Sequence, residues 1–209
     1  MKKPTVILTR PLPSEWIRSI KDRVDLIIGS EELGLNTPAL SPYFSEAEGL
    51  FSLLSDKVDK SVLDKMGKLR VATNMAAGFD NIDINECNER SIVVGNTPGV
   101  LTNATADITM GLILATTRNF ALSSQDALQG EWKTWSPTKW LGMELSEKTL
   151  GIIGLGKIGK AVAKRAQAFG MRIIYHNQSG PNPSVEENGW EYQSLEKLLR
   201  SSDVVSIHC

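Results

Sequence analysis

The chain has 209 residues, of which 41% are hydrophobic and 22% are charged, and its formal net charge is −1. This composition is ordinary for a globular protein, and the length allows one large or two small domains with a real core. The nearly neutral charge supplies no basic field for nucleic acid or a membrane surface, and no uninterrupted apolar stretch approaches the ~20 residues of a membrane span. The two cysteines, Cys87 and Cys209, form neither a disulfide framework nor a metal motif, so we expect a cytoplasmic protein without a metal site.

The first half of the chain alternates short apolar runs with segments of helical spacing. This alternation predicts an α/β fold with helices on both faces of a parallel sheet and ligands beyond the carboxyl ends of the strands. Ser14 is expected to cap the first helix, and residues 31–45, rich in Gly, Pro and Ser, are expected to be irregular. We predict strands at residues 6–8, 24–28, 50–54, 69–73 and 92–94, and helices at residues 14–23, 60–66 and 82–90.

The segment at residues 74–83 follows the fourth predicted strand and is rich in small residues. Its small residues would expose backbone amides, which suits a carboxylate ligand. A tight turn capped by Asp80 or Asn81, without any ligand, explains the same residues. The residues alone leave both interpretations open.

A long apolar helix is predicted from residue 102 to about residue 118, with Thr102 or Asn103 as its cap. Its spacing predicts a buried face that contains Ile108, Leu112 and Ala115. Because this helix leads from one α/β layer to a second, we expect a hinge just before it and the functional site in the cleft between two domains.

A polar, poorly periodic stretch at residues 123–148 contains Trp132, Trp135 and Trp140. Exposed aromatic side chains in a loop or arm often mark an interface with a partner. Packing of the tryptophans against the neighbouring domain is an equally good interpretation.

A glycine motif follows, in which the apolar run at residues 150–153 leads into Gly154, Gly156 and Gly159 and then into an Ala-rich helical segment. The pattern is strand, tight turn and helix. Gly154 lets the strand turn sharply, Gly156 lets the backbone approach a pyrophosphate, and Gly159 lets the helix pack closely on the strand. The amides of the first helical turn and the helix dipole would hold the phosphates.

The run at residues 171–175 predicts a second parallel strand, which completes a βαβ unit of ~30 residues. Ser194 is expected to cap a helix at residues 195–200, and residues 203–208 are expected to form a third parallel strand. These flanking elements favour a dinucleotide-binding fold over a glycine-rich turn without a ligand.

The residues after the second strand bear on the kind of cofactor. A carboxylate there would bind the ribose 2′-hydroxyl of NAD and repel a 2′-phosphate, but the chain has His176, Asn177, Gln178 and Ser179 in that place. Since no acidic residue rejects NADP and the amides and hydroxyl could donate to a phosphate, we favour NADP. No arginine follows the strand, so a permissive site that also accepts NAD is the alternative.

Four segments in this order carry a resemblance to a known family: VATNMAAGFDNID, VGNTPGVLTNATAD, KTLGIIGLGKIGKAVAKRAQAFGM and SLEKLLRSSDVVSIHC. The chain resembles the D-isomer-specific 2-hydroxyacid dehydrogenases, and within them the glyoxylate and hydroxypyruvate reductases. The resemblance implies two Rossmann-like or flavodoxin-like domains with parallel sheets. Residues 1–98 would form the substrate-binding domain, flavodoxin-like, and residues 99–209 a partial NAD(P)-binding Rossmann domain.

The resemblance also implies roles for particular positions. The amides at Ala76, Ala77 and Gly78 match the segment that holds the substrate carboxylate. The pyrophosphate turn is matched by Gly154, Gly156, Lys157, Ile158 and Gly159. Thr102 and Asp107 fall in a region near the nicotinamide, and Trp135 is similar in place to a tryptophan that some relatives insert into the active site of the partner subunit. A homodimer is therefore expected.

The family's chemistry is carried by an arginine, an acidic residue and a histidine that lie further along the chain, and none of the three has a counterpart in residues 1–209. His176 and His208 are expected not to be catalytic. We therefore expect the complete enzyme to reduce a small 2-oxoacid of the glyoxylate or hydroxypyruvate type with NAD(P)H, giving the D-2-hydroxyacid, and this chain alone to have essentially no turnover. A non-catalytic NAD(P)-binding sensor, similar to corepressors of this broad family, is the alternative, and a methyltransferase is a weaker one.

Overall fold

The structure is a computed structural model that describes residues 2–209, without the side chains of residues 186 and 187. It divides into two compact units, Met1–Val100 and Leu101–Cys209. The boundary that the family resemblance implies follows residue 98. Each unit is built on its own parallel β-sheet, so the predicted α/β fold is confirmed.

The first unit contains a five-stranded sheet in the order β2-β1-β3-β4-β5, and every neighbouring pair of strands is parallel. This order is one of the common doubly wound arrangements. The strands are β1 (Thr5–Leu8), β2 (Asp25–Ile28), β3 (Ala47–Ser52), β4 (Val71–Asn74) and β5 (Val93–Gly95). Each of them overlaps a strand predicted from the sequence, and the largest shift is in β3, which begins at Ala47 rather than at residue 50.

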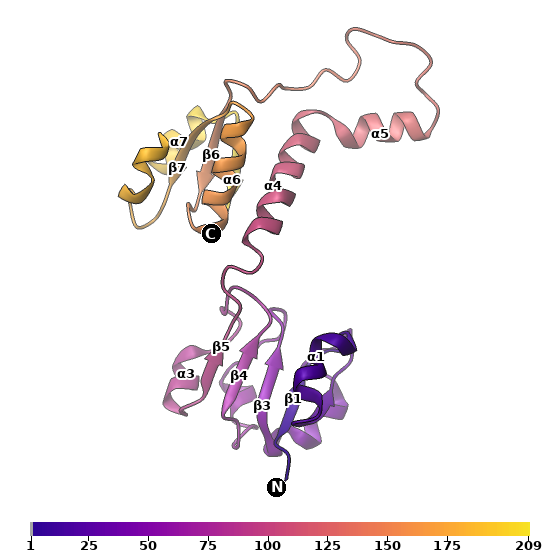
Figure 1. Cartoon of the computed structure of the whole chain (residues 1–209), viewed down its shortest axis with the longest axis vertical. Helices are drawn as coiled ribbons and strands as arrows, with labels where there is room; N and C mark the ends of the chain where they lie inside the picture. The colour runs from indigo at the N-terminus through magenta and orange to yellow at the C-terminus, as the bar shows by residue number, and fades with distance from the viewer. Residues whose placement is uncertain (1) are drawn as a thin grey trace. The chain divides into compact units, whose positions relative to one another are not determined.

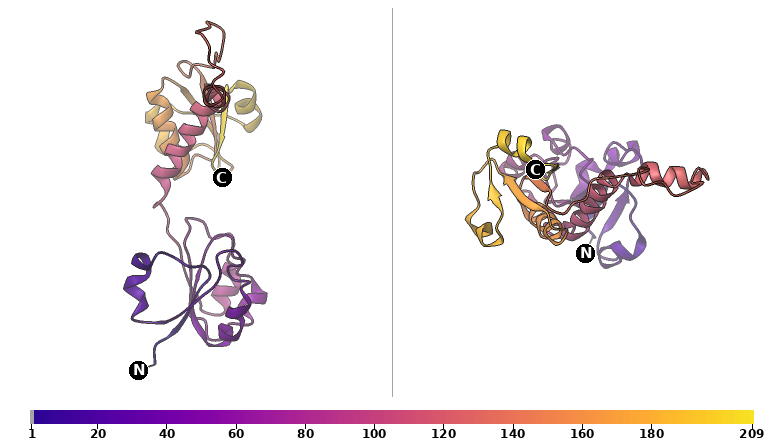
Figure 2. Two further views of the ribbon diagram at one scale, coloured as in Figure 1. Left: turned by 90° about the vertical axis from the view of Figure 1, so that its right-hand side faces the viewer. Right: turned by 90° about the horizontal axis from the view of Figure 1, so that it is seen from above.

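Helices cover both faces of the first sheet. They are α1 (Ser14–Lys21), the 3-10 helix η1 (Pro38–Glu46), α2 (Lys60–Leu63) and α3 (Ile84–Glu89). Figure 2 shows α1 on one side of the sheet and α3 on the other, as right-handed crossovers in opposite directions along the sheet require. The core lies under η1, α2 and α3 and contains Leu40, Leu50 and Leu63.

The helices α1, α2 and α3 lie where the sequence predicts them, but the predicted cap of α1 is wrong and η1 was not predicted. Asp59 and Asp83 accept hydrogen bonds from the amides of Val62 and Glu86 and so cap α2 and α3. Ser14 does not cap α1, because Pro13 occupies the N-cap position and the Ser14 hydroxyl bonds no amide of the helix. Most of η1 lies in the segment at residues 31–45, which was expected to be irregular.

The second unit contains a four-stranded parallel sheet in the order β8-β7-β6-β9. Its strands are β6 (Thr149–Ile153), β7 (Arg172–His176), β8 (Glu191–Tyr192) and β9 (Val204–Ile207), and its helices are α4 (Thr102–Thr117), α5 (Phe120–Leu128), α6 (Lys157–Ala168), the 3-10 helix η2 (Pro183–Asn188) and α7 (Leu195–Ser201). Helix α4 lies alongside α6 in Figure 1. Ser194 caps α7 as predicted, since its hydroxyl accepts from the amide of Lys197. The sequence did not predict α5 or β8.

Helix α4 is present, but its predicted buried face is wrong. Ile108 and Leu112 are 67% and 62% exposed, whereas Ala106, Met110 and Ile113 are buried. The buried face is the one that packs against α6 and the core of the second unit. Neither Thr102 nor Asn103 caps the helix, whose N-cap position is Leu101 and makes no side-chain hydrogen bond.

Among residues 2–209, no helix combines the length and the apolar character needed to cross a membrane.

Candidate functional site

The glycine turn between β6 and α6 has the geometry that the motif predicts. Gly154 has a φ of +91°, in the left-handed region that favours glycine, and its amide donates to the carbonyl of His176 at 2.9 Å. A Cβ atom on Gly154 would lie 2.6 Å from the carbonyl oxygen of His208. A side chain at this position would therefore strain the backbone and clash with the chain that follows β9.

The other two glycines differ in what surrounds them. A Cβ atom on Gly159 would lie 2.4 Å from the carbonyl oxygen of Gly154, so the helix approaches the strand too closely for alanine. At Gly156 an added Cβ atom meets nothing within 4 Å. The fold itself does not require glycine there, and the space beside Gly156 is open to a ligand. The arrangement fits a pyrophosphate next to Gly156.

The beginning of α6 supplies donors for such a group. The first backbone bond of the helix runs from the amide of Lys160 to the carbonyl of Gly156, so the amides of Lys157, Ile158 and Gly159 precede it and have no partner in the helix. The positive end of the helix dipole lies at the same place, and the Lys157 side chain is exposed. Anions are stabilised at such helix ends.

A pocket of about 740 Å³ lies against this turn. Its walls are the glycine turn and the residues that follow β7, namely Ile153, Gly154, Leu155, Gly156, His176, Asn177, Gln178, Ser179, Asn182 and Cys209. The four residues proposed to face the adenosine ribose thus lie together with the turn. None of the pocket residues within the described part of the chain is acidic.

Two of these four side chains are engaged by the protein. The Asn177 side-chain oxygen accepts from the amide of Leu155 at 2.7 Å and so braces the glycine turn. His176 is hydrogen-bonded through Nδ1 to the carbonyl of Gln193 at 3.0 Å and stacks on Tyr192. Gln178 and Ser179 are exposed, so of the four they are the ones available to a ligand.

Thr102 and Asp107 do not line this pocket. Thr102 is the first residue of α4, and the Asp107 carboxylate accepts from Arg165 Nε at 2.7 Å in an ion pair between α4 and α6.

The loop after β4 is held by hydrogen bonds to three successive carbonyls. The amide of Thr97 donates to Ala76 at 2.8 Å, Asn96 Nδ2 to Ala77 at 2.7 Å, and Asn74 Nδ2 to Gly78 at 2.9 Å. In the described part of the chain, the amides of residues 76–79 donate no hydrogen bond to a backbone or side-chain acceptor. The loop therefore presents unpaired donors, as a carboxylate ligand requires.

The bonds from Asn74 and Asn96 to this loop were not predicted from the sequence. A signal was available, because each asparagine lies at or just after the carboxyl end of a strand. Asn81, which was considered as a turn cap, donates instead to the carbonyl of Asp56 at 2.8 Å and so ties the loop to the segment that follows β3.

The segment after α5 has two exposed tryptophans and a third whose indole is hydrogen-bonded to a carboxylate. Trp132 and Trp135 are exposed. Trp140 has its indole Nε1 3.2 Å from the Asp126 carboxylate, which also pairs with Lys139 at 2.6 Å.

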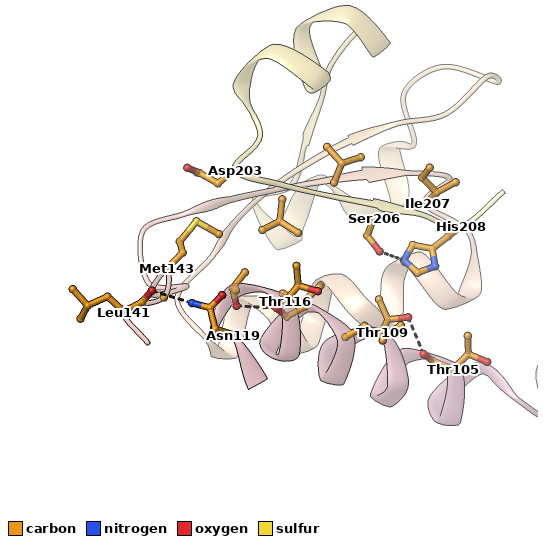
Figure 3. Close-up of a pocket in the computed structure, with 16 residues that line it drawn as sticks. Thr105, Thr109, Thr116, Asn119, Leu141, Met143, Asp203, Ser206, Ile207 and His208 are labelled. Atoms are coloured by element: carbon orange, nitrogen blue, oxygen red, sulfur yellow. Dashed lines mark hydrogen bonds between the residues drawn. The ribbon is translucent and has the colours of Figure 1, made fainter. Parts of the chain in front are cut away.

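His208 lies in a second cavity, of about 770 Å³, between α4 and β9. Its Nε2 is 2.9 Å from the Ser206 hydroxyl, on the side of the groove that faces Thr109, and Asp203 lies at the opposite end of the strand (Figure 3). Burial lowers the pKa of His208, which favours the neutral imidazole. No carboxylate among the described residues is bonded to this ring. Within the same residues, no group of three or more His, Cys, Asp or Glu side chains could hold a metal ion.

The family model described as "D-isomer specific 2-hydroxyacid dehydrogenase, NAD binding domain" matches residues 110–209. The chain is similar to the glyoxylate reductase of Thermococcus litoralis, with 41% identity over 210 residues that cover 99% of this chain and 63% of the relative. It is 42% identical over 212 residues to the glyoxylate reductase of Aeropyrum pernix, covering 100% of this chain and 63% of the relative. The chain thus spans less than two thirds of the length of these curated relatives.

Solved structures agree with this likeness. A protein from Thermus thermophilus superposes with a TM-score of 0.89 at 39% identity, over 98% of this chain and 64% of that one. The D-lactate dehydrogenase from Aquifex aeolicus, solved in complex with NAD and lactic acid, superposes with a TM-score of 0.86 at 27% identity, over 98% of this chain and 60% of that one.

Proposed function

Because this chain belongs to the D-isomer-specific 2-hydroxyacid dehydrogenase family, we propose that the protein acts in the NAD(P)H-dependent reduction of a small 2-oxoacid, of the glyoxylate or hydroxypyruvate type, to the D-2-hydroxyacid. The observation that carries the proposal is the turn at Gly154, Gly156 and Gly159, whose open side at Gly156 suits a pyrophosphate. The nicotinamide cofactor, when bound, supplies the hydride.

In this proposal the first unit is the substrate-binding domain and the second unit is the cofactor-binding domain. The amides at Ala76, Ala77 and Gly78 bind the carboxylate of the 2-oxoacid. The turn with Lys157 and Ile158 binds the pyrophosphate, and Thr102 and Asp107 lie near the nicotinamide. Trp135, which is exposed, contacts the partner subunit of a homodimer.

We further propose that the cofactor is NADP rather than NAD. The pocket at the end of β7 has no acidic wall residue within the described chain to repel a 2′-phosphate, and Gln178 and Ser179 are free to donate to one. We expect NADPH to bind the 209-residue chain about tenfold more tightly than NADH, since each charge-assisted hydrogen bond contributes about 1.5–3 kcal/mol. Titration calorimetry with both cofactors measures the ratio, and a preference for NADH would overturn this choice. The matched variants Gln178→Ala and Ser179→Ala should narrow the ratio without weakening NADH binding.

The experiment that tests the proposed function separates binding from turnover. The family's catalytic arginine, acid and histidine have no counterpart in residues 1–209, and His208 is bonded to Ser206. We therefore expect the 209-residue chain to bind NADPH and to oxidise essentially none of it in the presence of glyoxylate. A version of the protein that includes the family's three catalytic residues should reduce glyoxylate. Turnover by the 209-residue chain at the rate of a full-length relative would show that the catalytic groups are wrongly assigned, and a failure to bind either nicotinamide cofactor would contradict the function itself.

A further inference from the structure

We propose that Asn96 is a positioning residue for the substrate carboxylate, because its side chain fixes the direction in which the loop after β4 presents its amides. This inference rests on the proposed function, in which that loop binds the carboxylate. Asn96 lies directly after β5, far from the loop in sequence, and its Nδ2 donates to the carbonyl of Ala77 at 2.7 Å.

The peptide unit is planar, which links the direction of each carbonyl to that of the following N–H group. In a trans peptide the carbonyl of one residue and the N–H of the next point in opposite directions, so holding the oxygen on one side aims the hydrogen to the other. The carbonyls of Ala76, Ala77 and Gly78 are all held by donors of the protein. The N–H groups of Ala77, Gly78 and Phe79 are therefore aimed away from those donors.

These three aimed amides differ by one position from the set expected from the sequence. The N–H group of Ala76 belongs to the Met75–Ala76 peptide, which is not one of the three whose carbonyls are held. The N–H group of Phe79 belongs to the Gly78–Phe79 peptide, whose carbonyl is held by Asn74. No acceptor in the described chain occupies the amides of residues 77–79. Three neighbouring N–H groups without a protein partner in the described chain can bind an anion with two oxygens, such as a carboxylate.

Asn96 and Asn74 each hold a peptide next to Gly78, and of these two donors Asn96 is the one without a second side-chain hydrogen bond in the described chain. Peptides next to glycine rotate at low cost, since glycine lacks the steric limits of a Cβ atom. The bond from the Thr97 amide to Ala76 is made by backbone, and Asn74 is buried and also bonded to Asn81. Asn96 is half-buried, so its replacement removes the restraint while water can still solvate the carbonyl it leaves.

The test compares Asn96→Ala with Asn85→Ala in the 209-residue chain. Asn85 is an exposed asparagine of α3, in the same unit, and its replacement serves as the matched control. Glyoxylate is titrated into each ¹⁵N-labelled protein and the amide shifts of residues 77–79 are followed. The same samples are used for ¹⁵N relaxation of these amides without glyoxylate and for titration with NADPH.

We expect Asn96→Ala to weaken glyoxylate binding at least about fivefold, the effect of one lost hydrogen bond, and to increase the motion of amides 77–79. NADPH binding should be unchanged, and Asn85→Ala should match the unmodified chain in every measurement. If Asn96→Ala leaves both glyoxylate affinity and loop relaxation unchanged, Asn96 does not position the loop. If the amides of the unmodified chain do not respond to glyoxylate while Asn96→Ala still loosens the loop, the proposed substrate role of the loop is wrong and the restraint by Asn96 is purely structural, which overturns the inference as well.

Discussion

At Gly154, Gly156 and Gly159, which lie in one turn, an added Cβ atom would meet three different environments. Gly154 has the backbone conformation that only glycine adopts easily, and Gly159 is in contact with a backbone carbonyl. Gly156 borders open space. The fold therefore requires glycine at Gly154 and Gly159, whereas at Gly156 it leaves room for a side chain or for a ligand.

Gly156→Ala and Gly159→Ala should therefore differ in their effects on thermal stability and on NADPH binding. The first should change Tm by less than about 2 °C and weaken NADPH binding, because the new methyl group fills only ligand space. The second should lower Tm by more than about 5 °C, because the helix must move away from the carbonyl of Gly154. Thermal unfolding followed by circular dichroism and titration calorimetry with NADPH measure both effects. Equal losses of Tm in the two variants would contradict the separation.

Among the elements, α4 shows how a helix that is apolar on more than one side is oriented by its neighbour. Its apolar residues lie on two faces, and α6 covers the one with Ala106, Met110 and Ile113. Arg165 of α6 reinforces this choice, because it pairs with Asp107 and also contacts Asn103 at the start of α4. The exposed ion pair adds little stability by itself, so the burial of the apolar face is the main determinant of the rotation of the helix.

A pair of substitutions in α4 tests this orientation. Ile113→Ala should destabilise the chain by about 2–5 kcal/mol, as expected when a buried side chain is truncated and leaves a cavity. Ile108→Ala should cost less than about 0.5 kcal/mol, because the side chain is exposed. Urea unfolding of both variants gives the comparison, and a larger loss for Ile108→Ala would show that the other face of α4 is the buried one.

For the whole molecule, the main feature is the presence of two separate hydrophobic cores. One core contains Leu50 and Leu63 of the first unit, and the other contains Leu150 and Val162 of the second. Each core is closed by elements of its own unit. In a chain built in this way, one unit can unfold while the other stays folded.

Scanning calorimetry should accordingly resolve two transitions. Leu63→Ala should lower the temperature of one transition and Leu150→Ala that of the other, because both side chains are fully buried in different cores. NADPH should raise only the transition that Leu150→Ala lowers, since a ligand stabilises the unit that binds it. A single transition that both variants lower equally would mean that the two units unfold together.

Much of this protein was determined by the sequence itself, because the relevant signals are local. The alternation of short apolar runs with helical spacing, the glycines of the turn and the cap at Ser194 depend on residues close together in the chain, and all are present in the structure. The buried face of α4, the bracing of the turn by Asn177 and the hold of Asn96 on the loop after β4 were decided only by the tertiary structure. Each of these joins residues that are distant in sequence, and spacing along a single segment carries no information about which side of a helix or peptide a distant partner will approach.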